Sequence, residues 1–374
     1  MINENIIKND ERAIFELREL YRQYGYSQFK MSKFEEYDLY VKNKDFLVSD
    51  EVITFTDRNG KLMALKPDVT LSIIKNTADK AGVIQKVYYN ENVFRVSKGT
   101  HSFKEIMQAG LECIGDLHSY EIAEVVLLAV KSLALISKNY VLDISHMGLV
   151  AAMLDDSGLS YEGKGAAHTF LHQKNAHELR AVCEAEGIAE DKILKLCSLI
   201  NCCGNAQQVL SAIAPMLTND REQEAFEEFK TLCDIIERSG FASSVIVDFS
   251  VGNDMKYYSG VVFKGYLEGI PTSILSGGQY DKLLKKMKRE SKAVGFAIYL
   301  DLLEQMDTDS NDYDVDTILL YDVNCNPLTL TSAVDRLANS VHSVRVSTEI
   351  PAQVKYRRLL KLTEGRIETL EENG

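Results

Sequence analysis

The 374-residue sequence predicts an α+β fold, in which a block of helices interrupts an antiparallel sheet. Three observations support this prediction. Strand-like runs occur before residue 115 and return after residue 244. Between about 148 and 240 the chain is rich in Ala, Leu, Glu and Lys and has few strand signals. A doubly wound parallel sheet would instead alternate strands and helices along its whole length.

The first part of the chain is expected to contain two helices and two strand pairs. In order, these are a helix over 8–25, strands over 52–56 and 61–65, strands over 86–96 and 106–114, and a helix over 120–136. The first helix has apolar residues at helical spacing, and Gly25 is a suitable stop. Asn59-Gly60, between the first two strands, is a strong hairpin signal.

After the helical block, strands alternate with turns. The expected elements are strands over 244–249, 257–266 and 272–275, a Gly277-Gly278 turn, a basic helix and an apolar run over 293–303. Beyond these lie a strand over 317–321, a helix near 329–339, a strand over 343–347 and a charged helix from about 354. The predicted domains are 1–306, with a helical insertion at about 148–240, an acidic linker over 307–314, and a short α/β segment over 315–374.

Charge and composition exclude several functions. The formal net charge is −13, so the surface would on average repel RNA, and tRNA is an improbable ligand. No apolar run approaches the ~20 residues needed to cross a bilayer, and the first twelve residues do not form a secretory signal. A cytoplasmic protein with no membrane contact is expected. The seven cysteines include no paired CxxC motifs, and His168, His172 and His177 lack an acid to complete a metal set, so no metal site is expected.

Four segments, in order, resemble the class II aminoacyl-tRNA synthetases, and the histidyl branch in particular. They are the hairpin over 54–70 with Lys66-Pro-Asp-Val-Thr70, the motif 2-like stretch over 88–115 with Gln108-Ala-Gly-Leu-Glu112, the blocks Tyr257-Tyr258 to Phe263 and Gly277-Gly-Gln-Tyr-Asp281, and the motif 3-like start at Ala293-Val-Gly-Phe-Ala297. Together they span roughly residues 10–305. The combination of the Tyr257-Tyr258 pair with the Gly277-Gly-Gln-Tyr-Asp281 block is specific to the histidyl branch. The resemblance implies a class II synthetase-like sheet with flanking helices.

The same resemblance implies a histidine pocket. The residues that match it are Asp68, Thr70, Gln108, Glu112, Tyr257 and Tyr258. In the family, the first three hold the amino group of histidine, while Glu112 and Tyr258 would contact the imidazole. Gln108 and Glu112 are four apart on a strand, so both side chains are expected on one face. Considered alone, Asp68 is typical of a turn residue after Pro67. Because all of these positions match the family together, we favour the pocket.

The residues needed for adenylation are mostly replaced. Arg95 stands where motif 2 contacts the α-phosphate. The replaced positions are Ser97 for the companion acid, Asn253 for the catalytic arginine, Lys256 for an acid, Tyr299 for a small residue and Leu302 for the adenine-stacking arginine. Losing one cation from a phosphoryl-transfer site typically costs on the order of 10³ in rate. Synthetase activity is therefore predicted to be lost, and no cofactor is expected.

A second resemblance is to the family of regulatory subunits of short-form ATP phosphoribosyltransferase. It implies a non-catalytic regulatory subunit in histidine biosynthesis, needed for activity and for feedback inhibition. The implied partners are a short catalytic subunit and histidine as allosteric effector, with a homodimer core inside a hetero-oligomer. Histidine could bind the old pocket, which we hypothesise, or the subunit interface. The alternative function is a divergent histidine–tRNA ligase or another histidine-activating enzyme.

Overall fold

The computed structural model describes residues 7–44, 52–77, 79, 82–97, 100–252, 257–306, 313–341 and 343–373. The chain divides into two compact units, Met1–Met306 and Asp307–Gly374. In the described residues of the larger unit, a nine-stranded mixed sheet is combined with helices, and the α+β prediction is confirmed. The larger unit carries the site described below.

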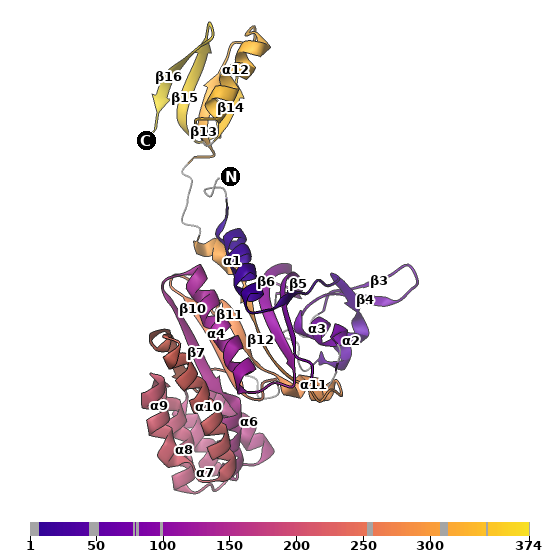
Figure 1. The fold of residues 1–374 in the computed structure, drawn as a ribbon, viewed down its shortest axis with the longest axis vertical. Helices are drawn as coiled ribbons and strands as arrows, with labels where there is room; N and C mark the ends of the chain where they lie inside the picture. Colours follow the sequence, from indigo (N-terminus) through magenta and orange to yellow (C-terminus); the bar gives the residue numbers. More distant parts are fainter. Residues whose placement is uncertain are drawn as a thin grey trace. The chain divides into compact units, whose positions relative to one another are not determined.

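The nine-stranded sheet forms the centre of the larger unit (Figure 1). In pairing order its strands are β1 (Ser27–Gln28), β5 (Gln85–Val96), β6 (Phe103–Gly115), β12 (Lys292–Tyr299), β11 (Leu275–Gln279), β10 (Val261–Leu267), β7 (Tyr140–His146), β9 (Val245–Asp248) and β8 (Cys203–Gly204). From β5 to β7 every neighbouring pair is antiparallel. The side chains therefore alternate between two faces along each strand.

Helices α1 (Asn9–Gln23) and α4 (Ser119–Ile136) cover one face of this sheet. Helix α4 is apolar on most of its surface, so it is buried between the sheet and other helices. The helices meet at a buried hydrogen bond of 3.1 Å between the Tyr21 hydroxyl and Ser132 Oγ. From β6, Leu111 and Cys113 pack into this core, which leaves Gln108 and Glu112 on the opposite face.

A small sheet lies beside the main one. In pairing order it contains β2 (Phe34–Glu36), β4 (Leu62–Leu65) and β3 (Thr54–Thr56). Along the chain, α2 (Tyr37–Lys42) follows β2, and α3 (Thr70–Asn76) follows β4. The predicted hairpin is confirmed: Asp57 Oδ1 accepts hydrogen bonds of 2.8 Å from the backbone N–H groups of Asn59 and Lys61. Gly60 has φ +80°, which glycine adopts without steric cost.

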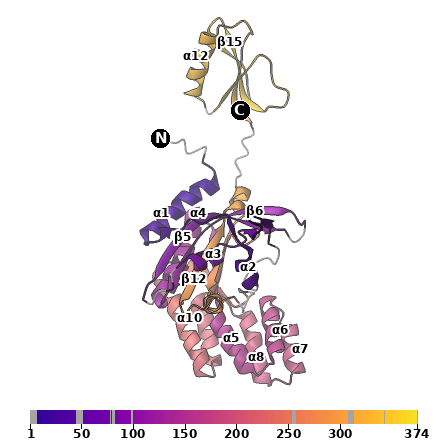
Figure 2. The same ribbon diagram turned by 90° about the vertical axis from the view of Figure 1, so that its right-hand side faces the viewer.

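The predicted run of helices occupies residues 147–238 at one end of the sheet (Figures 1 and 2). The helices are α5 (Met147–Ser157), α6 (Tyr161–His172), α7 (Ala176–Ala185), α8 (Glu190–Asn201), α9 (Ala206–Ile213) and α10 (Asp220–Arg238), with 3₁₀ turns at Ala214–Met216 and Ala242–Ser244. Asparagine side chains cap the N-termini of α7, α9 and α10; that of Asn219, for example, accepts a hydrogen bond from the Glu222 N–H at 3.0 Å. Lys195 Nζ and Glu222 Oε1 form a buried pair at 2.6 Å between α8 and α10.

The expected turn at Gly277-Gly278 is wrong. Both residues lie inside β11, which pairs with β10 and β12, and α11 (Asp281–Lys286) follows. A Cβ at Gly277 would lie 2.4 Å from Phe296 Cβ, and one at Gly278 would lie 2.6 Å from the Tyr258 ring. Glycine is used here for close packing within a strand rather than for a turn.

The smaller unit is a four-stranded sheet with helix α12. Its order is β14 (Val344–Ser347), β13 (Val315–Leu320), β15 (Tyr356–Thr363) and β16 (Arg366–Glu372), and α12 spans Pro327–Ala338. The predicted charged helix from about 354 is wrong, because this segment forms the β15–β16 hairpin. Glu364 and Gly365 make its two-residue turn with φ +50° and +80°, and Leu360 and Leu362 point to the core at strand spacing.

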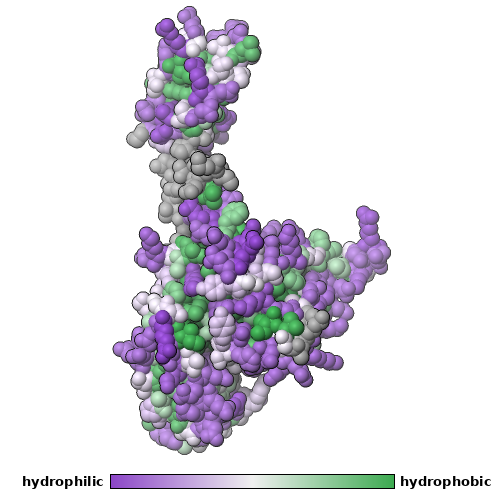
Figure 3. Space-filling view, in the orientation of Figure 1, coloured by the Kyte–Doolittle hydropathy of each residue, from purple (hydrophilic) through white to green (hydrophobic). Residues whose placement is uncertain are grey.

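The surface of the chain is largely polar. Hydrophilic side chains cover most of the face in Figure 3, and apolar ones form small separate groups. On the small sheet, the partly exposed rings of Phe34 and Phe55 pack edge to face at 5.4 Å. Within the described ranges, the helices are too short or too polar to span a membrane.

Candidate functional site

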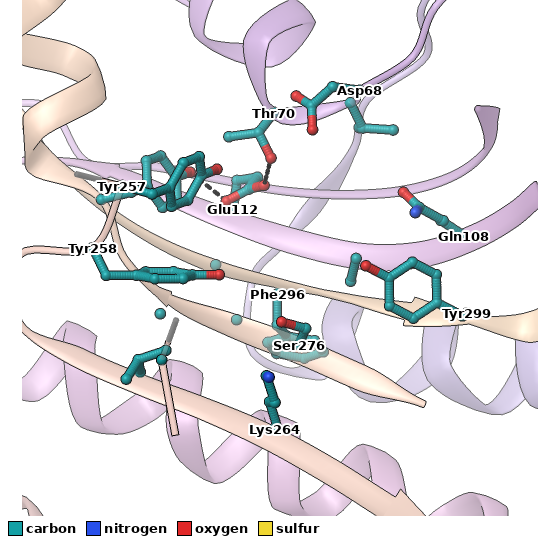
Figure 4. Close-up of a pocket in the computed structure, with 18 of the residues that line it drawn as sticks. Asp68, Thr70, Gln108, Glu112, Tyr257, Tyr258, Lys264, Ser276, Phe296 and Tyr299 are labelled. Carbon is teal, nitrogen blue, oxygen red and sulfur yellow. Dashed lines mark hydrogen bonds between the residues drawn. The ribbon is translucent and has the colours of Figure 1, made fainter. Parts of the chain in front are cut away.

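A cavity of about 360 Å³ opens on the face of the main sheet opposite α1 and α4. All six residues predicted for a histidine pocket line it: Asp68, Thr70, Gln108, Glu112, Tyr257 and Tyr258 (Figure 4). They come from three segments far apart in the sequence: the start of α3, strand β6 and the turn before β10. Arg95 and Tyr299 also line the cavity. The volume lies in the range of small-molecule sites.

Glu112 is the central acid of the pocket and is only 2 % exposed. Its carboxyl group accepts a hydrogen bond of 2.8 Å from Thr70 Oγ1 and another from the Tyr280 hydroxyl. The pKa of Glu112 is raised from 4.5 to about 8, chiefly by burial and to a smaller extent by the nearby Asp68, although the two hydrogen bonds oppose the shift. Glu112 is therefore expected to hold a proton near neutral pH. A ligand that brings positive charge or an N–H donor would relieve this cost.

Glycines make room for these side chains. A Cβ at Gly295 would lie 1.8 Å from Glu112 Oε2 and 2.5 Å from the Leu111 carbonyl oxygen. A Cβ at Gly110 would lie 2.2 Å from the Phe296 carbonyl oxygen. At Gly110 and Gly295 the floor of the pocket is therefore formed by backbone atoms alone. The Glu112 carboxyl group packs directly against the Gly295 backbone. Glycine weakens a strand interior, so its use at these positions reflects close approach of other groups.

Asp68 occupies the start of α3. Its Oδ1 accepts a hydrogen bond of 2.9 Å from the Leu71 N–H, as a helix-capping acid does. Burial raises the pKa of Asp68, while the Leu71 N–H and the Arg95 guanidinium partly offset that rise. Arg95 Nε in turn donates to the Pro67 carbonyl oxygen at 3.2 Å. Arg95 therefore balances the charge of Asp68 on this wall of the pocket.

Three tyrosines close one side of the cavity. The rings of Tyr257 and Tyr258 pack edge to face with centroids 4.8 Å apart, and Tyr257 lies 5.8 Å from Tyr280. Tyr280 donates its hydroxyl proton to Glu112, so it fixes the orientation of the carboxyl group. Tyr280 belongs to the Gly277-Gly-Gln-Tyr-Asp281 block of the family resemblance but was not among the predicted pocket residues. The Tyr-Asp that follows the double glycine is the sequence signal that marks it.

Gln108 and Tyr299 form the opposite side. They are register partners on β6 and β12, and both line the cavity. Gln108 is 3 % exposed, so its amide is removed from water at the pocket wall. The ring of Tyr299 occupies a position where the family resemblance implies a small residue. Figure 4 shows Gln108 and Tyr299 together, away from the Tyr257–Tyr258 pair.

The other replaced synthetase positions lie apart from the pocket or outside the described residues. Asn253 and Lys256 fall outside them. Ser97 follows β5, and its backbone N–H donates to the Ser102 carbonyl oxygen at 2.9 Å. Leu302 lies in the 3₁₀ helix Leu300–Met306 and packs against the main core. Leu302 thus supplies an apolar contact to the core.

In the described part of the chain, no three His, Cys, Asp or Glu side chains are grouped as metal ligands. His172 Nδ1 lies 2.6 Å from the Ser250 carbonyl oxygen, and His168 is buried. Both histidines therefore contribute to packing and hydrogen bonding within the fold.

The antiparallel sheet, the glycine floor and the acid-and-tyrosine pocket define a protein of the histidyl-tRNA synthetase type. The histidyl-tRNA synthetase family model matches residues 3–303. A relative from Clostridium novyi (strain NT), named ATP phosphoribosyltransferase regulatory subunit, is 31 % identical over 293 residues, which cover 76 % of this chain and 69 % of the relative. The chain belongs to the histidyl-tRNA synthetase family and, within it, to the ATP phosphoribosyltransferase regulatory subunits.

Two solved structures share the fold. One, from Bacillus halodurans, is described as an ATP phosphoribosyltransferase regulatory subunit/histidyl-tRNA synthetase; it superposes with a TM-score of 0.76 at 23 % identity and covers 94 % of this chain and 93 % of that one. The other is a chain of the ATP phosphoribosyl transferase (HisG:HisZ) complex from Thermotoga maritima, with a TM-score of 0.61 at 18 % identity, covering 77 % and 96 %. At these identities they show the common fold, which agrees with the class II synthetase-like prediction.

Proposed function

We propose that this chain is the non-catalytic regulatory subunit of a short-form ATP phosphoribosyltransferase, and that it binds histidine in the pocket described above. The observation that carries the proposal is the meeting of six side chains in one cavity: Asp68, Thr70, Gln108, Glu112, Tyr257 and Tyr258. Asp68 and Gln108 suit the ammonium group, and Glu112 and the Tyr258 hydroxyl suit the two nitrogens of an imidazole.

Adenylation lacks support in the same cavity. Activation of a carboxylate by ATP requires positioned cations for the phosphates and room for the base. Arg95 lines the cavity, but it balances Asp68 and donates to Pro67. Tyr299 fills part of the space, and Leu302 packs in the core. We propose that synthetase activity is lost; a divergent histidine–tRNA ligase stays the alternative, and Arg95 is the residue that favours it.

The proposed partner is a short catalytic ATP phosphoribosyltransferase chain in the cytoplasm, with a homodimer of this chain as the core of the assembly. If histidine binds one arrangement of that assembly more tightly than another, it shifts the population by the ratio of the two affinities. A coupling of about 1–3 kcal/mol is typical of such systems and suffices for feedback inhibition. Feedback would then need no chemistry in this subunit.

Calorimetric titration with histidine, in the presence and absence of ATP and magnesium, tests the proposal. We expect the purified chain to bind histidine with an affinity that ATP does not alter, and to release no pyrophosphate. Adding the catalytic chain of the same organism should yield a complex by size-exclusion chromatography, and histidine should inhibit its activity. Histidine-dependent pyrophosphate exchange would instead restore the ligase, and a chain that binds no histidine, alone or in the complex, would refute the sensing pocket.

A further inference from the structure

Lys264 is a second cation in the pocket, besides Arg95, and it is not among the residues predicted for the site. It lies on β10 and lines the cavity. In the part of the chain that the structure describes, its ammonium group makes no hydrogen bond or ion pair. Its strand is otherwise apolar over Val261–Phe263, so a lone lysine on the pocket face is the signal that could have drawn attention to it.

The pairing register sets the reach of this lysine. Across the sheet, Lys264 is paired with Ser276 of β11, Ser276 with Ala297 of β12, and Ala297 with Gly110 of β6. Paired residues point to the same face, and neighbouring strands are about 4.8 Å apart. The floor between Lys264 and β6 therefore consists of small side chains only, and the long lysine stem can extend over it. In Figure 4 the Lys264 ammonium lies near Ser276, at the lower edge of the cavity.

The charges of the pocket are separated. Asp68 and Thr70 lie on the wall opposite Lys264, with Glu112 between (Figure 4). Arg95 is held on the Asp68 side, where it donates to the Pro67 carbonyl oxygen and partly offsets the rise in the pKa of Asp68 that burial causes. On the Lys264 side, Asp143 of β7 is the register partner of Lys264, and the two charges attract each other without forming an ion pair. One wall thus attracts a cation, and the other presents an ammonium group that forms no ion pair with the described residues.

We infer that Lys264 binds the α-carboxylate of the ligand, so that the pocket recognises a free zwitterionic amino acid. This inference rests on the proposed histidine-sensing function. The ligand ammonium would lie against Asp68 and Gln108, its imidazole against Glu112 and Tyr258, and its carboxylate against Lys264. A desolvated ammonium–carboxylate contact is among the stronger polar interactions in proteins. The site would accept the finished amino acid and discriminate against its alcohol or its ester.

Lys264→Met tests this, because methionine keeps an unbranched apolar stem and removes the charge. The probes are histidine and histidinol, which has CH₂OH in place of the carboxylate, both titrated calorimetrically into the full chain. The wild-type chain is expected to prefer histidine by about 10- to 100-fold, the range of a charge-assisted contact. In Lys264→Met the histidine affinity should fall to near that of histidinol, while histidinol binding stays unchanged. Lys264→Arg should retain most of the preference.

The matched control is Lys230→Met. Lys230 lies on α10, is half exposed, pairs with Glu227 at 3.7 Å and is not among the residues that line the cavity. Melting curves of each variant establish that it is folded. Equal histidine affinity in Lys264→Met and the wild type, with the wild type binding histidine, overturns the inference alone. Failure of the wild-type chain and its complex to bind histidine overturns the proposed function with it.

Discussion

The Glu112→Gln variant is expected to be more stable than the wild-type chain at pH 8 and to bind histidine at least about 30-fold more weakly, the size expected for loss of a buried charged hydrogen bond. Glutamine has nearly the same shape as glutamate and cannot ionise. The hydroxyls of Thr70 and Tyr280, which donate to Glu112 in the wild type, can each donate to the amide oxygen or accept from its N–H. The substitution therefore removes the ionisable group and leaves the packing.

The stability difference should depend on pH. The pKa of Glu112 is about 8 in the folded chain and about 4.5 without burial, so between these values the folded state holds a proton that the unfolded state has released. The free energy of unfolding of the wild type then falls as pH rises from about 4.5 to 8, and the contribution of Glu112 is constant above pH 8. Glutamine lacks this slope, and the gap at pH 8 should be on the order of 2–4 kcal/mol.

Urea unfolding at pH 5 and pH 8, together with histidine titration at pH 7.5, measures both effects. Glu105→Gln is the matched control, since Glu105 is an exposed residue of the same strand β6 and should change neither quantity. A Glu112→Gln chain that loses stability in parallel with the wild type between these pH values would contradict the protonated, buried carboxyl. Unchanged histidine binding in Glu112→Gln or Glu112→Ala would place the histidine site elsewhere.

Gly295→Ala is expected to destabilise the larger unit by about 2–4 kcal/mol and to abolish histidine binding. The added methyl group would meet Glu112 Oε2 at 1.8 Å and the Leu111 carbonyl oxygen at 2.5 Å. The carboxyl group can move away, but it then leaves Thr70 and Tyr280. The backbone oxygen cannot move without shifting β6 relative to β12. Chemical unfolding and histidine calorimetry report the two losses separately.

Gly165→Ala provides the control. Gly165 lies within α6, and a Cβ there would meet nothing within 4 Å, so alanine should stabilise the chain by about 0.5–1 kcal/mol. The double variant Gly295→Ala with Glu112→Ala shows how much of the stability lost in Gly295→Ala is due to the Glu112 carboxyl and how much to the Leu111 carbonyl oxygen. Partial recovery of stability in the double variant identifies the carboxyl as one source of the clash. Wild-type stability of Gly295→Ala would contradict the close packing of β12 on β6.

The helices and the first hairpin could be predicted because their signals are local. The periodicity of residues 8–25, the Asn59-Gly60 turn and the alanine- and leucine-rich block from 148 each act within a few residues. The double glycine at 277–278 was mistaken for a turn, because its cause is the distant Phe296 and Tyr258 side chains. The final hairpin was missed because its charged outer face resembles a helix, although Glu364-Gly365 marked the turn.

The candidate site shows the same division. The resemblance to a known family placed six side chains in one pocket without knowledge of the fold. Tyr280, which orients Glu112, and Lys264, which faces the acids, went unselected because their relevance depends on strand register. Composition and spacing report what a residue can do. Only the pairing of β10, β11, β12 and β6 reports which groups share the cavity.

The glycine floor also constrains how this pocket can evolve. Gly110, Gly278 and Gly295 create space by the absence of atoms, so every single substitution there adds bulk against backbone or ring atoms. New ligand preferences have to arise instead from the rim, where Gln108, Tyr299 and Lys264 project into the cavity. A mutational scan scored by ligand binding would show an intolerant floor under an adaptable rim. A lineage could thus change what it senses by exchanging side chains at the edge while the sheet beneath them stays fixed.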